Sequence, residues 1–400
     1  MHRLAFFVAF LFAGLSSTKA QWDIEASHTT ADLRGIDNVG KGIAWASGAN
    51  GTVLRTTDNG VRWQTCAVPP EAEHLDFRGI QAFDASTAII MSSGRGPLSR
   101  LYKTTDACQS WTLLFTNPDP KGFWDAVSFS NVDSGWVFGD PSGGRFTLLR
   151  VLRTYKQPCI GDTSKCATEL SMIDQSSPSV SADSATQTAF AASNSAFAVL
   201  WGANHVYYGP PPLDAKMAAD VTHVDQEWFA TGGRGGAYIF SHNINSGDYA
   251  QYGVPASWDK MAVPVGDKSE SSGIFSVAFR RQSPADPFVG VAVGGDYKRP
   301  EESAHSAAYR MNWQHEWQDA QTPPHGYRSA VAYDPAAKTW ITVGPNGTDI
   351  STDDGRNWRA LKPSATDTPG ADRDWNALSL PFVVGPHGRI GKLNAKTLAP

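Results

Sequence analysis

The chain has 400 residues and a formal net charge of −5, with 11% aromatic and only 18% charged residues. This balance leaves no basic footprint for nucleic acid and excludes that class of partner. Glycine (37), proline (25) and tryptophan (14) are frequent, a profile typical of many short strands joined by tight turns.

The N-terminal segment has the pattern of a secretory leader. His2 and Arg3 form a short basic region, and residues 4–15 form an apolar run that is too short to span a bilayer. Thr18 and Ala20 are small residues at the two positions that a signal peptidase reads. We therefore expect residues 1–20 to be a cleaved signal peptide, with an uncleaved anchor as the alternative, and the protein to be periplasmic or secreted. No other stretch is apolar enough to cross a membrane.

Two strand patterns then repeat along the chain. A large, a variable, a small and an aliphatic residue follow one another in what we predict to be innermost strands, at residues 33–36, 77–80, 124–127, 274–277, 327–330 and 375–378. Apolar strands that end in a glycine-rich turn lie at residues 45–48, 91–94, 137–140, 229–232, 291–294, 341–344 and 382–385. Most of these seven copies are about 41 to 62 residues apart, the size of a four-stranded propeller blade.

A turn motif, Ser/Thr-x-Asp-x-Gly-x-x-Trp, predicts hairpins at the outer strands. It occupies residues 56–63, 104–111 and 351–358, and a degenerate copy lies at 312–317. The Asp carboxylate can accept backbone N–H bonds inside the turn, the Gly adopts positive φ at low cost, and the Trp buries its ring in the sheet. We interpret the motif residues as structural rather than catalytic: Asp58, Gly60, Trp63, Asp106, Trp111, Asp353, Gly355 and Trp358.

These patterns predict an all-β fold, a seven-bladed β-propeller of four-stranded blades that forms a single domain over residues 21–400. The last blade lacks an outermost strand, and residues 22–25, which alternate apolar and polar side chains, are expected to supply it and close the ring. The spacing breaks between Gly139 and Gly232. We interpret this break as a long insertion around residues 150–226; the alternative is an eighth blade around residues 200–202.

Four cysteines remain after the leader, an even number that suits an oxidising compartment. Cys108 stands where the turn motif has glycine, and a bond to Cys66 would offset the cost of its Cβ. Cys159 and Cys166 are close enough to close a small loop. Four free buried thiols are the alternative to these two disulfides. Because no CxxC pair, histidine cluster or Asp-rich calcium loop is present, we expect no metal.

The mouth of the central channel is the candidate site. The variable position of the innermost strands lies on the same face as the glycine-rich turns, and it holds Arg34, Arg78, Asp125, Phe275, Arg328 and Asn376. The turns add Asp140, Asp296 and several arginines. Arginine suits bidentate contact with a carboxylate or phosphate, which indicates an anion or acidic-peptide docking face. The alternative is that the arginines pair with carboxylates to tie the blades together. The candidate binding residues are Arg34, Arg78, Asp125, Asp296, Arg328 and Asn376.

The turn motifs resemble those of the Asp-box (BNR-repeat) β-propellers. Residues 42–51, followed by a strand and Thr-Thr-Asp-Asn-Gly at 56–60, are similar to the repeats of the photosystem II stability/assembly factor-like family within the sialidase-like and WD40/YVTN-like propellers. Arginine at the start of the innermost strands adds to the likeness, which covers blades 1, 2, 5, 6 and 7. The resemblance implies a non-enzymatic scaffold that binds a partner protein or anionic ligand outside the cytoplasm; we expect a monomer.

A glycoside hydrolase of the sialidase-like superfamily is the alternative. Arg34, Arg78 and Arg328 invite comparison with the three arginines by which sialidases hold a sugar carboxylate. However, the chain has no Arg-Ile-Pro motif and no matching Tyr–Glu pair, and nothing in the spacing of Asp125 and Asp296 selects them as paired acids. Dinucleotide and nucleophile-elbow motifs are also absent. We therefore predict no catalytic residues and no cofactor.

Overall fold

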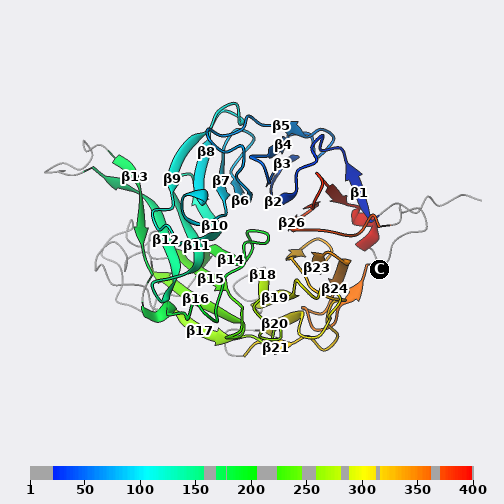
Figure 1. The fold of residues 1–400 in the computed structure, drawn as a ribbon. Coiled ribbons are helices and arrows are strands. Elements are labelled where there is room, and N and C mark those ends of the chain that lie inside the picture. The colour runs from blue at the N-terminus through cyan, green and yellow to red at the C-terminus, as the bar shows by residue number, and fades with distance from the viewer. Residues whose placement is uncertain are drawn as a thin grey trace, which may run out of the picture.

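The computed structural model describes residues 21–156, 168–176, 178–204, 223–245, 258–280, 288–311, 316–361 and 370–398. Seven four-stranded antiparallel sheets stand in a ring, so the predicted seven-bladed β-propeller is confirmed (Figure 1). Short 3₁₀ helices at Gly96–Leu98, Pro178–Val180 and Ala395–Leu398 are the helical elements of this part of the chain. Within it, no helix has the length and apolar character needed to cross a membrane.

The blades follow one another in chain order, each from its innermost to its outermost strand. They consist of β2 (Leu33–Gly40), β3 (Ile43–Gly48), β4 (Val53–Thr56) and β5 (Gln64–Thr65); β6 (Phe77–Ala82), β7 (Ala88–Ser92), β8 (Arg100–Thr104) and β9 (Thr112–Thr116); β10 (Trp124–Asn131), β11 (Ser134–Ser142), β12 (Arg145–Tyr155) and β13 (Thr168–Asp174); β14 (Phe197–Asn204), β15 (His223–Ala230), β16 (Tyr238–Asn245) and β17 (Asp259–Ala262); β18 (Ser272–Arg280), β19 (Val289–Asp296), β20 (Ala307–Met311) and β21 (Gln318–Asp319); β22 (Ala330–Asp334), β23 (Thr339–Gly344), β24 (Gly347–Ser351) and β25 (Arg359–Ala360); and β26 (Ala377–Ser379), β27 (Phe382–Val384) and β28 (Ile390–Leu393).

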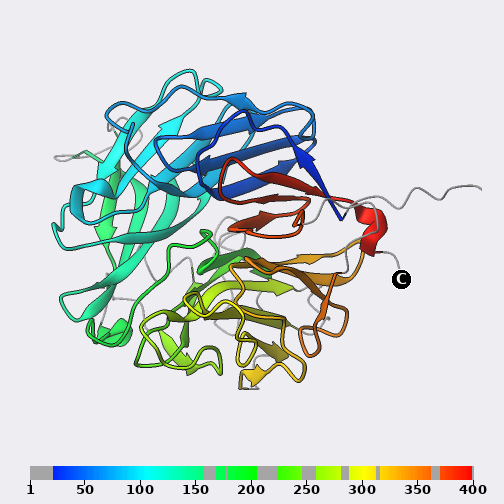
Figure 2. The same cartoon turned by 45° about the vertical axis from the view of Figure 1, so that its right-hand side comes forward.

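The N-terminal strand closes the ring, as predicted. Strand β1 (Trp22–Glu25) pairs antiparallel with β28, from Trp22 opposite Leu393 to Glu25 opposite Ile390. Figures 1 and 2 show this blue strand at the outside of the red last blade. Because β1 covers the open edge of β28, the first and last segments of the ring are joined by backbone hydrogen bonds.

The core lies between neighbouring blades. The second strands, such as β3 and β7, are buried on both faces because each blade has a neighbour on either side, and this is why they read as continuous apolar runs. Trp45 of blade 1, for example, packs in one cluster with Phe77 and Ile90 of blade 2. The ring is therefore stabilised by contacts between blades as well as within them.

Strand β14, the innermost strand of blade 4, was not predicted. Residues 200–202 belong to it, so they do not mark an eighth blade. The rest of the predicted insertion, residues 150–226, includes β13, parts of β12 and β15, the 3₁₀ helix Pro178–Val180 and the loop that leads from it to β14. Its other residues lie outside the described part of the chain. The predicted signal peptide, residues 1–20, also lies outside it.

The turn-motif residues lie between the third and fourth strands of their blades. In the first of these turns, Asp58 Oδ1 accepts hydrogen bonds from Thr56 Oγ1 and from the Arg62 N–H, both at 2.9 Å. Asp106 and Asp353 accept the same pair of bonds. The rings of Trp63, Trp111 and Trp358 are buried. Since the strands of a blade alternate in direction, these turns lie on the face opposite the glycine-rich turns.

The predicted disulfide between Cys66 and Cys108 is confirmed. Cys108 has a φ of 60°, in the left-handed region that its glycine position requires. The bond joins blade 1 to a turn of blade 2 across 42 positions of sequence. Cys159 and Cys166 lie outside the described residues, so their pairing stays a prediction.

Replacing both Cys66 and Cys108 by serine is expected to lower the free energy of unfolding by about 3 kcal/mol, because the unfolded chain regains the entropy of a long open loop. A Cys66→Ser, Cys108→Gly protein should recover about 1 kcal/mol of this loss, since glycine tolerates the positive φ. Urea unfolding of the oxidised wild type and both variants measures the two differences. Equal stability of the oxidised and reduced wild type would contradict the expectation.

A carboxyl group joins blades 1 and 2 at another point. Asp37 Oδ2 accepts hydrogen bonds from the Ala82 N–H at 2.7 Å and from Gln81 Nε2 at 3.1 Å. Burial raises the pKa of Asp37 from 3.8 to about 6, and the bond from Ala82 opposes the rise. The folded protein therefore holds this proton more tightly than the unfolded chain does.

The stabilising contribution of Asp37 is expected to be full below about pH 4 and to be lost as the pH rises through about 6. Asp37→Asn should abolish that slope and be more stable than wild type above about pH 7, by about 2 kcal/mol after allowance for screening. The amide oxygen can still accept both bonds. Urea unfolding across this pH range, with the exposed Asp259→Asn as control, tests the sign: a wild type that gains stability through this window relative to Asp37→Asn would contradict it.

Candidate functional site

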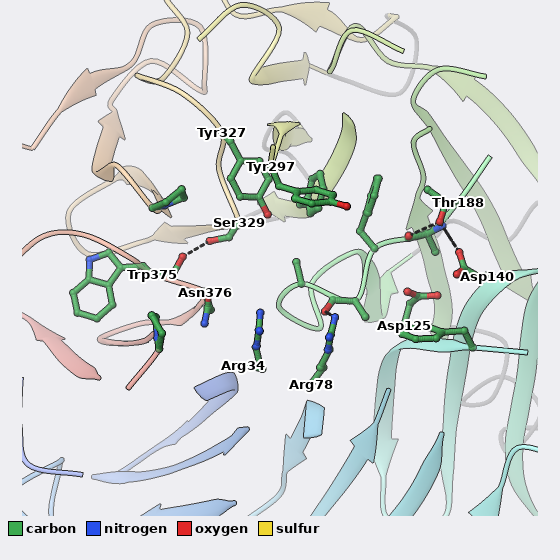
Figure 3. A pocket seen from close by; sticks show the side chains of 18 of the residues that line it. Arg34, Arg78, Asp125, Asp140, Thr188, Tyr297, Tyr327, Ser329, Trp375 and Asn376 are labelled. Atoms are coloured by element: carbon green, nitrogen blue, oxygen red, sulfur yellow. Dashed lines mark hydrogen bonds between the residues drawn. The ribbon is translucent and has the colours of Figure 1, made fainter. Parts of the chain in front are cut away.

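A cavity of about 580 Å³ opens on the face that carries the starts of the innermost strands (Figure 3). Every blade or the loop before it contributes to the lining, which consists of Arg34, Arg78, Phe123, Asp125, Asp140, Thr188, Ala189, Phe190, Ala191, Ala192, Glu270, Phe275, Tyr297, Tyr327, Ser329, Pro345, Asp374, Trp375, Asn376 and Pro386. The predicted candidates Arg34, Arg78, Asp125 and Asn376 are therefore brought together. Pockets of this size hold small molecules or a few side chains of a peptide.

The lining includes a loop that lies in the middle of the ring, residues 188–195, which we call the central loop (Figure 1). Its polar side chains bond to blades on different sides of the channel. Ser193 Oγ donates to the Ser329 carbonyl at 2.9 Å, and Asn194 Oδ1 accepts the Val127 N–H at 2.8 Å. Ser195 Oγ donates to Ser276 Oγ at 2.7 Å. These bonds to blades 6, 3 and 5 hold the loop as a floor beneath the cavity.

Bulges in the innermost strands aim the variable residue into the cavity. The register of pairing shifts around Arg34, Arg78, Asp125 and Phe275, each of which is the unpaired extra residue of its strand. A bulged residue leaves the ladder and its side chain is re-aimed. This backbone feature explains why residues at one sequence position of four different blades meet around one opening.

The two arginines of the cavity differ in their bonding. Arg78 Nε donates to Asp76 at 2.8 Å, and Nη1 donates to the Ala191 carbonyl of the central loop at 3.2 Å. Arg34 forms neither a hydrogen bond nor an ion pair within the part of the chain that the structure describes, and its Nε is buried without a partner. Arg34 is thus a cation at the cavity wall whose hydrogen-bonding capacity is unused.

A pair of carboxyl groups lies beside Arg78, on the side away from Arg34 (Figure 3). Burial raises the pKa of Asp125 well above its ordinary value, and the nearby Asp140 adds to the rise, whereas Arg78 opposes it. Burial also raises the pKa of Asp140, although its Oδ1 accepts bonds from Thr188 Oγ1 at 2.7 Å and the Ala189 N–H at 2.8 Å. Each carboxyl group therefore favours its neutral form more than an exposed one would.

Aromatic rings form much of the remaining wall. Phe190 of the central loop stacks on Phe275, with ring centroids 4.0 Å apart, and Tyr327 meets Phe275 edge-on. Tyr297 stands at the rim with 48% of its surface exposed. The glycine-rich turn pattern placed Asp140 on this face, but no motif marked Tyr297 or the central loop as part of the lining. Tyr327 and Trp375 are the large residues of the innermost-strand pattern. The same position is occupied by core residues in other blades, so the pattern did not indicate that these two line the cavity.

Arg328 does not line the cavity, so its predicted place at the mouth is wrong. Its side chain is fully buried, where Nη2 lies 2.5 Å from Asp349 Oδ2 and Nη1 donates to the Gly347 carbonyl at 2.9 Å. The physical reason is that β22 begins only at Ala330 and pairs with β23 without a bulge, so nothing re-aims Arg328 toward the channel. Tyr327 faces the cavity in its place.

Asp296 is also outside the cavity. Its carboxylate is buried and accepts bonds from Ser269 Oγ at 2.8 Å and from Arg299 Nη2 at 2.8 Å. It is therefore not brought together with Asp125. Arg234 and Arg299 likewise pair with carboxylates of nearby turns. Arg234 and Arg299 therefore fit the alternative interpretation, in which arginines pair with carboxylates and stabilise the fold. Among the described residues, no group of His, Cys, Asp and Glu could hold a metal ion.

Comparison with known proteins supports the fold. No protein-family model and no curated protein matches the chain. Among solved structures, YCF48 from Cyanidioschyzon merolae is 15% identical, with a TM-score of 0.54, and the match covers 94% of this chain and 100% of that one. A structure of YCF48 bound to D1 peptide is 13% identical, with a TM-score of 0.50 and coverage of 93% and 96%. The predicted resemblance to photosystem II assembly factor-like propellers is thus confirmed in the fold.

Proposed function

We propose that this protein is an exported, non-catalytic scaffold that holds a segment of a partner protein in the cavity, where Arg34 receives a carboxylate of that segment. The observation that carries the proposal is the guanidinium group of Arg34, which lies at the wall of a preformed cavity with no partner in the described structure. A partly buried cation without a counter-ion is costly, and an acidic ligand group removes that cost.

The rest of the cavity suits a peptide better than a single small ion. Its aromatic walls offer apolar area for side chains, and its volume of about 580 Å³ exceeds what one carboxylate group needs. Arg78 is bonded to Asp76 and to the central loop, so it shapes the site and leaves Arg34 as the principal anion contact. That YCF48, a propeller of similar fold, has been solved with a D1 peptide supports a peptide as the ligand class.

Export is part of the proposal. The leader-like pattern of residues 1–20 and the disulfide between Cys66 and Cys108 support it, because disulfides persist mainly in oxidising compartments. We expect Edman degradation or mass analysis of the mature protein to identify Gln21 as its first residue. A mature protein that retains its first 20 residues in the cytoplasm would overturn the export proposal.

Arg34→Gln is expected to weaken the binding of peptides selected from a randomised array by about ten- to a hundredfold, with little change in stability. Wild-type affinity should fall as salt is raised, and the variant should have a weaker salt dependence. Arg95→Gln is a matched control, since Arg95 is exposed on the same face and does not line the cavity. Equal loss of affinity in both variants would show that general charge, not Arg34, is responsible.

A glycoside hydrolase remains the second candidate, favoured by one observation. Asp125 and Asp140 form a carboxyl pair with raised pKa values in a cavity, as acid catalysts often do. Fluorogenic glycosides and sialosides test it, and we expect no turnover. Turnover that Asp125→Asn abolishes and Glu302→Gln leaves intact would instead establish the enzyme, since Glu302 is an exposed carboxylate outside the cavity.

A further inference from the structure

The cavity has an acidic end that the proposed role of Arg34 does not use. Asp125 is 1% exposed, and its Oδ2 is buried without a hydrogen-bond partner in the described structure. Asp140 accepts its two bonds at Oδ1 alone, so its Oδ2 is also unused. Figure 3 places the pair beyond Arg78, away from Arg34. Each of these neighbouring carboxyl groups therefore has one oxygen, Oδ2, without a hydrogen-bond partner among the described residues.

Among the described residues, no basic side chain forms an ion pair with either of these two acids. Arg78 is close enough to lower the pKa of Asp125, yet its ion pair is with Asp76. Two other acids line the cavity: Glu270 pairs with Arg234, outside the lining, and Asp374 opposes the lowering of the Arg389 pKa by burial. Neither Asp125 nor Asp140 forms an ion pair with any residue that the structure describes. The cavity thus presents an unused cation at Arg34 and unused acids at the other end.

We propose that Asp125 and Asp140 form a subsite for a lysine or arginine side chain of the bound segment. This inference rests on the proposed function, because it names a second group of the same ligand. An ammonium or guanidinium group would supply the hydrogen-bond donors that the two Oδ2 atoms lack, and it would bring the positive charge that is missing there. The occupant is then a segment with a basic and an acidic group, matched to the two ends of the cavity.

Aromatic side chains provide for the stem of such a residue. Phe190 follows Ala189, whose N–H bonds to Asp140, and it stacks on Phe275 at 4.0 Å. Tyr297 lies edge-on to Phe275 at 6.0 Å and is half exposed. The methylene groups of lysine or arginine pack on such rings while the charged end reaches past them to the carboxylates. Specificity for a long basic side chain over a short one follows from this arrangement.

The charge state of the pair makes binding depend on pH. The groups that face Asp125 are Asp140 on β11 and Arg78 on β6, while the central loop adds no charge beside it. Burial and Asp140 together raise the pKa of Asp125, and a cation bound beside it would lower that pKa again. Binding of a basic side chain should release protons, and its affinity should rise with pH until Asp125 is ionised without the ligand.

Two probes test the subsite. The first is the set of peptides that the wild type selects from the randomised array, each compared with a copy in which lysine is replaced by norleucine. The second is Nα-acetyl-lysine methylamide, whose affinity is compared with that of its norleucine counterpart by isothermal titration calorimetry. We expect lysine or arginine to be enriched among selected peptides. Norleucine copies should bind about ten- to a hundredfold more weakly to the wild type. The affinity for the lysine peptides should rise with pH, whereas that for the norleucine copies should not.

Asp125→Asn and Asp140→Asn should remove this preference for lysine while binding norleucine copies as the wild type does, and Glu302→Gln should keep it. The subsite proposal is overturned if the selected peptides contain no enriched basic residue. It is also overturned if the Asp125→Asn protein still prefers lysine peptides to their norleucine copies. If no peptide binds but the lysine probe binds in an Asp125-dependent way, the subsite stands and the peptide-scaffold function fails. If neither probe distinguishes lysine from norleucine, the subsite is wrong even where Arg34-dependent peptide binding persists.

Discussion

Replacing Arg328 by methionine is expected to destabilise the protein by about 3–5 kcal/mol. Arg328 is fully buried, and its guanidinium is bonded to the Asp349 carboxylate and the Gly347 carbonyl. Methionine fills a similar volume but leaves the buried Asp349 without its main counter-charge. The loss is therefore the cost of an unpaired buried carboxylate, and it should appear as a lower urea midpoint with an unchanged slope.

A double variant separates this cause from simple loss of packing. Arg328→Met with Asp349→Leu should be less destabilised than the sum of the single variants, because no unpaired charge remains. Arg34→Gln is the matched arginine control and should unfold almost as the wild type does, since Arg34 has no partner to lose. Additive single effects, or an Arg328→Met protein as stable as Arg34→Gln, would refute the assignment of Arg328 as a structural tie.

Trp358→Ala is the second large effect, with an expected loss of about 3–5 kcal/mol. The ring is buried with Val291 and Tyr309 of blade 5 and Trp340 of blade 6, so it fills the space between two blades. Its Nε1 donates to the Gly355 carbonyl at 3.0 Å. Alanine leaves a cavity at this junction and also frees the Gly355 carbonyl, so the two losses add.

Urea unfolding of Trp358→Ala beside Val61→Ala provides the comparison. Val61 stands in the first turn motif with 79% of its surface exposed, so its truncation should change the free energy of unfolding by less than about 0.5 kcal/mol. Peptide affinity of the folded Trp358→Ala protein should equal that of the wild type, because the turn lies on the face opposite the cavity. A selective loss of affinity at unchanged stability would place a binding role on that face instead.

The two arginine positions show how a small backbone feature decides between binding and structure. Arg34 and Arg328 occupy the same position of the repeated pattern. A bulge turns Arg34 into the cavity, whereas the absence of one leaves Arg328 inside blade 6, paired with Asp349. In place of the predicted Arg-rich mouth, the structure has a cavity in which Arg34 is unpaired among the described residues and a pair of acids lies beyond Arg78.

The ring of blades could be predicted from the amino-acid sequence alone. Apolar strands that end in glycine, recurring at blade spacing, marked the second strand of all seven blades, and alternation at residues 22–25 located the closing strand. The cysteine in a glycine position likewise pointed to its partner Cys66. These features were accessible because each arises from neighbouring residues: strand alternation, turn conformation and the burial that a repeated unit imposes.

The arrangement of the candidate site could not be predicted in this way. The central loop has no repeating pattern. Its Asn194 bonds to Val127 of blade 3 and to Ile80 of blade 2, which are 67 and 114 positions away in the sequence. The pairing of Asp125 with Asp140, the burial of Arg328 and the aromatic wall all depend on which segments the closed ring brings to its centre. A residue type at a repeat position states which chemistry is available, but its neighbours across the channel determine whether a charge is paired, buried or left free for a ligand.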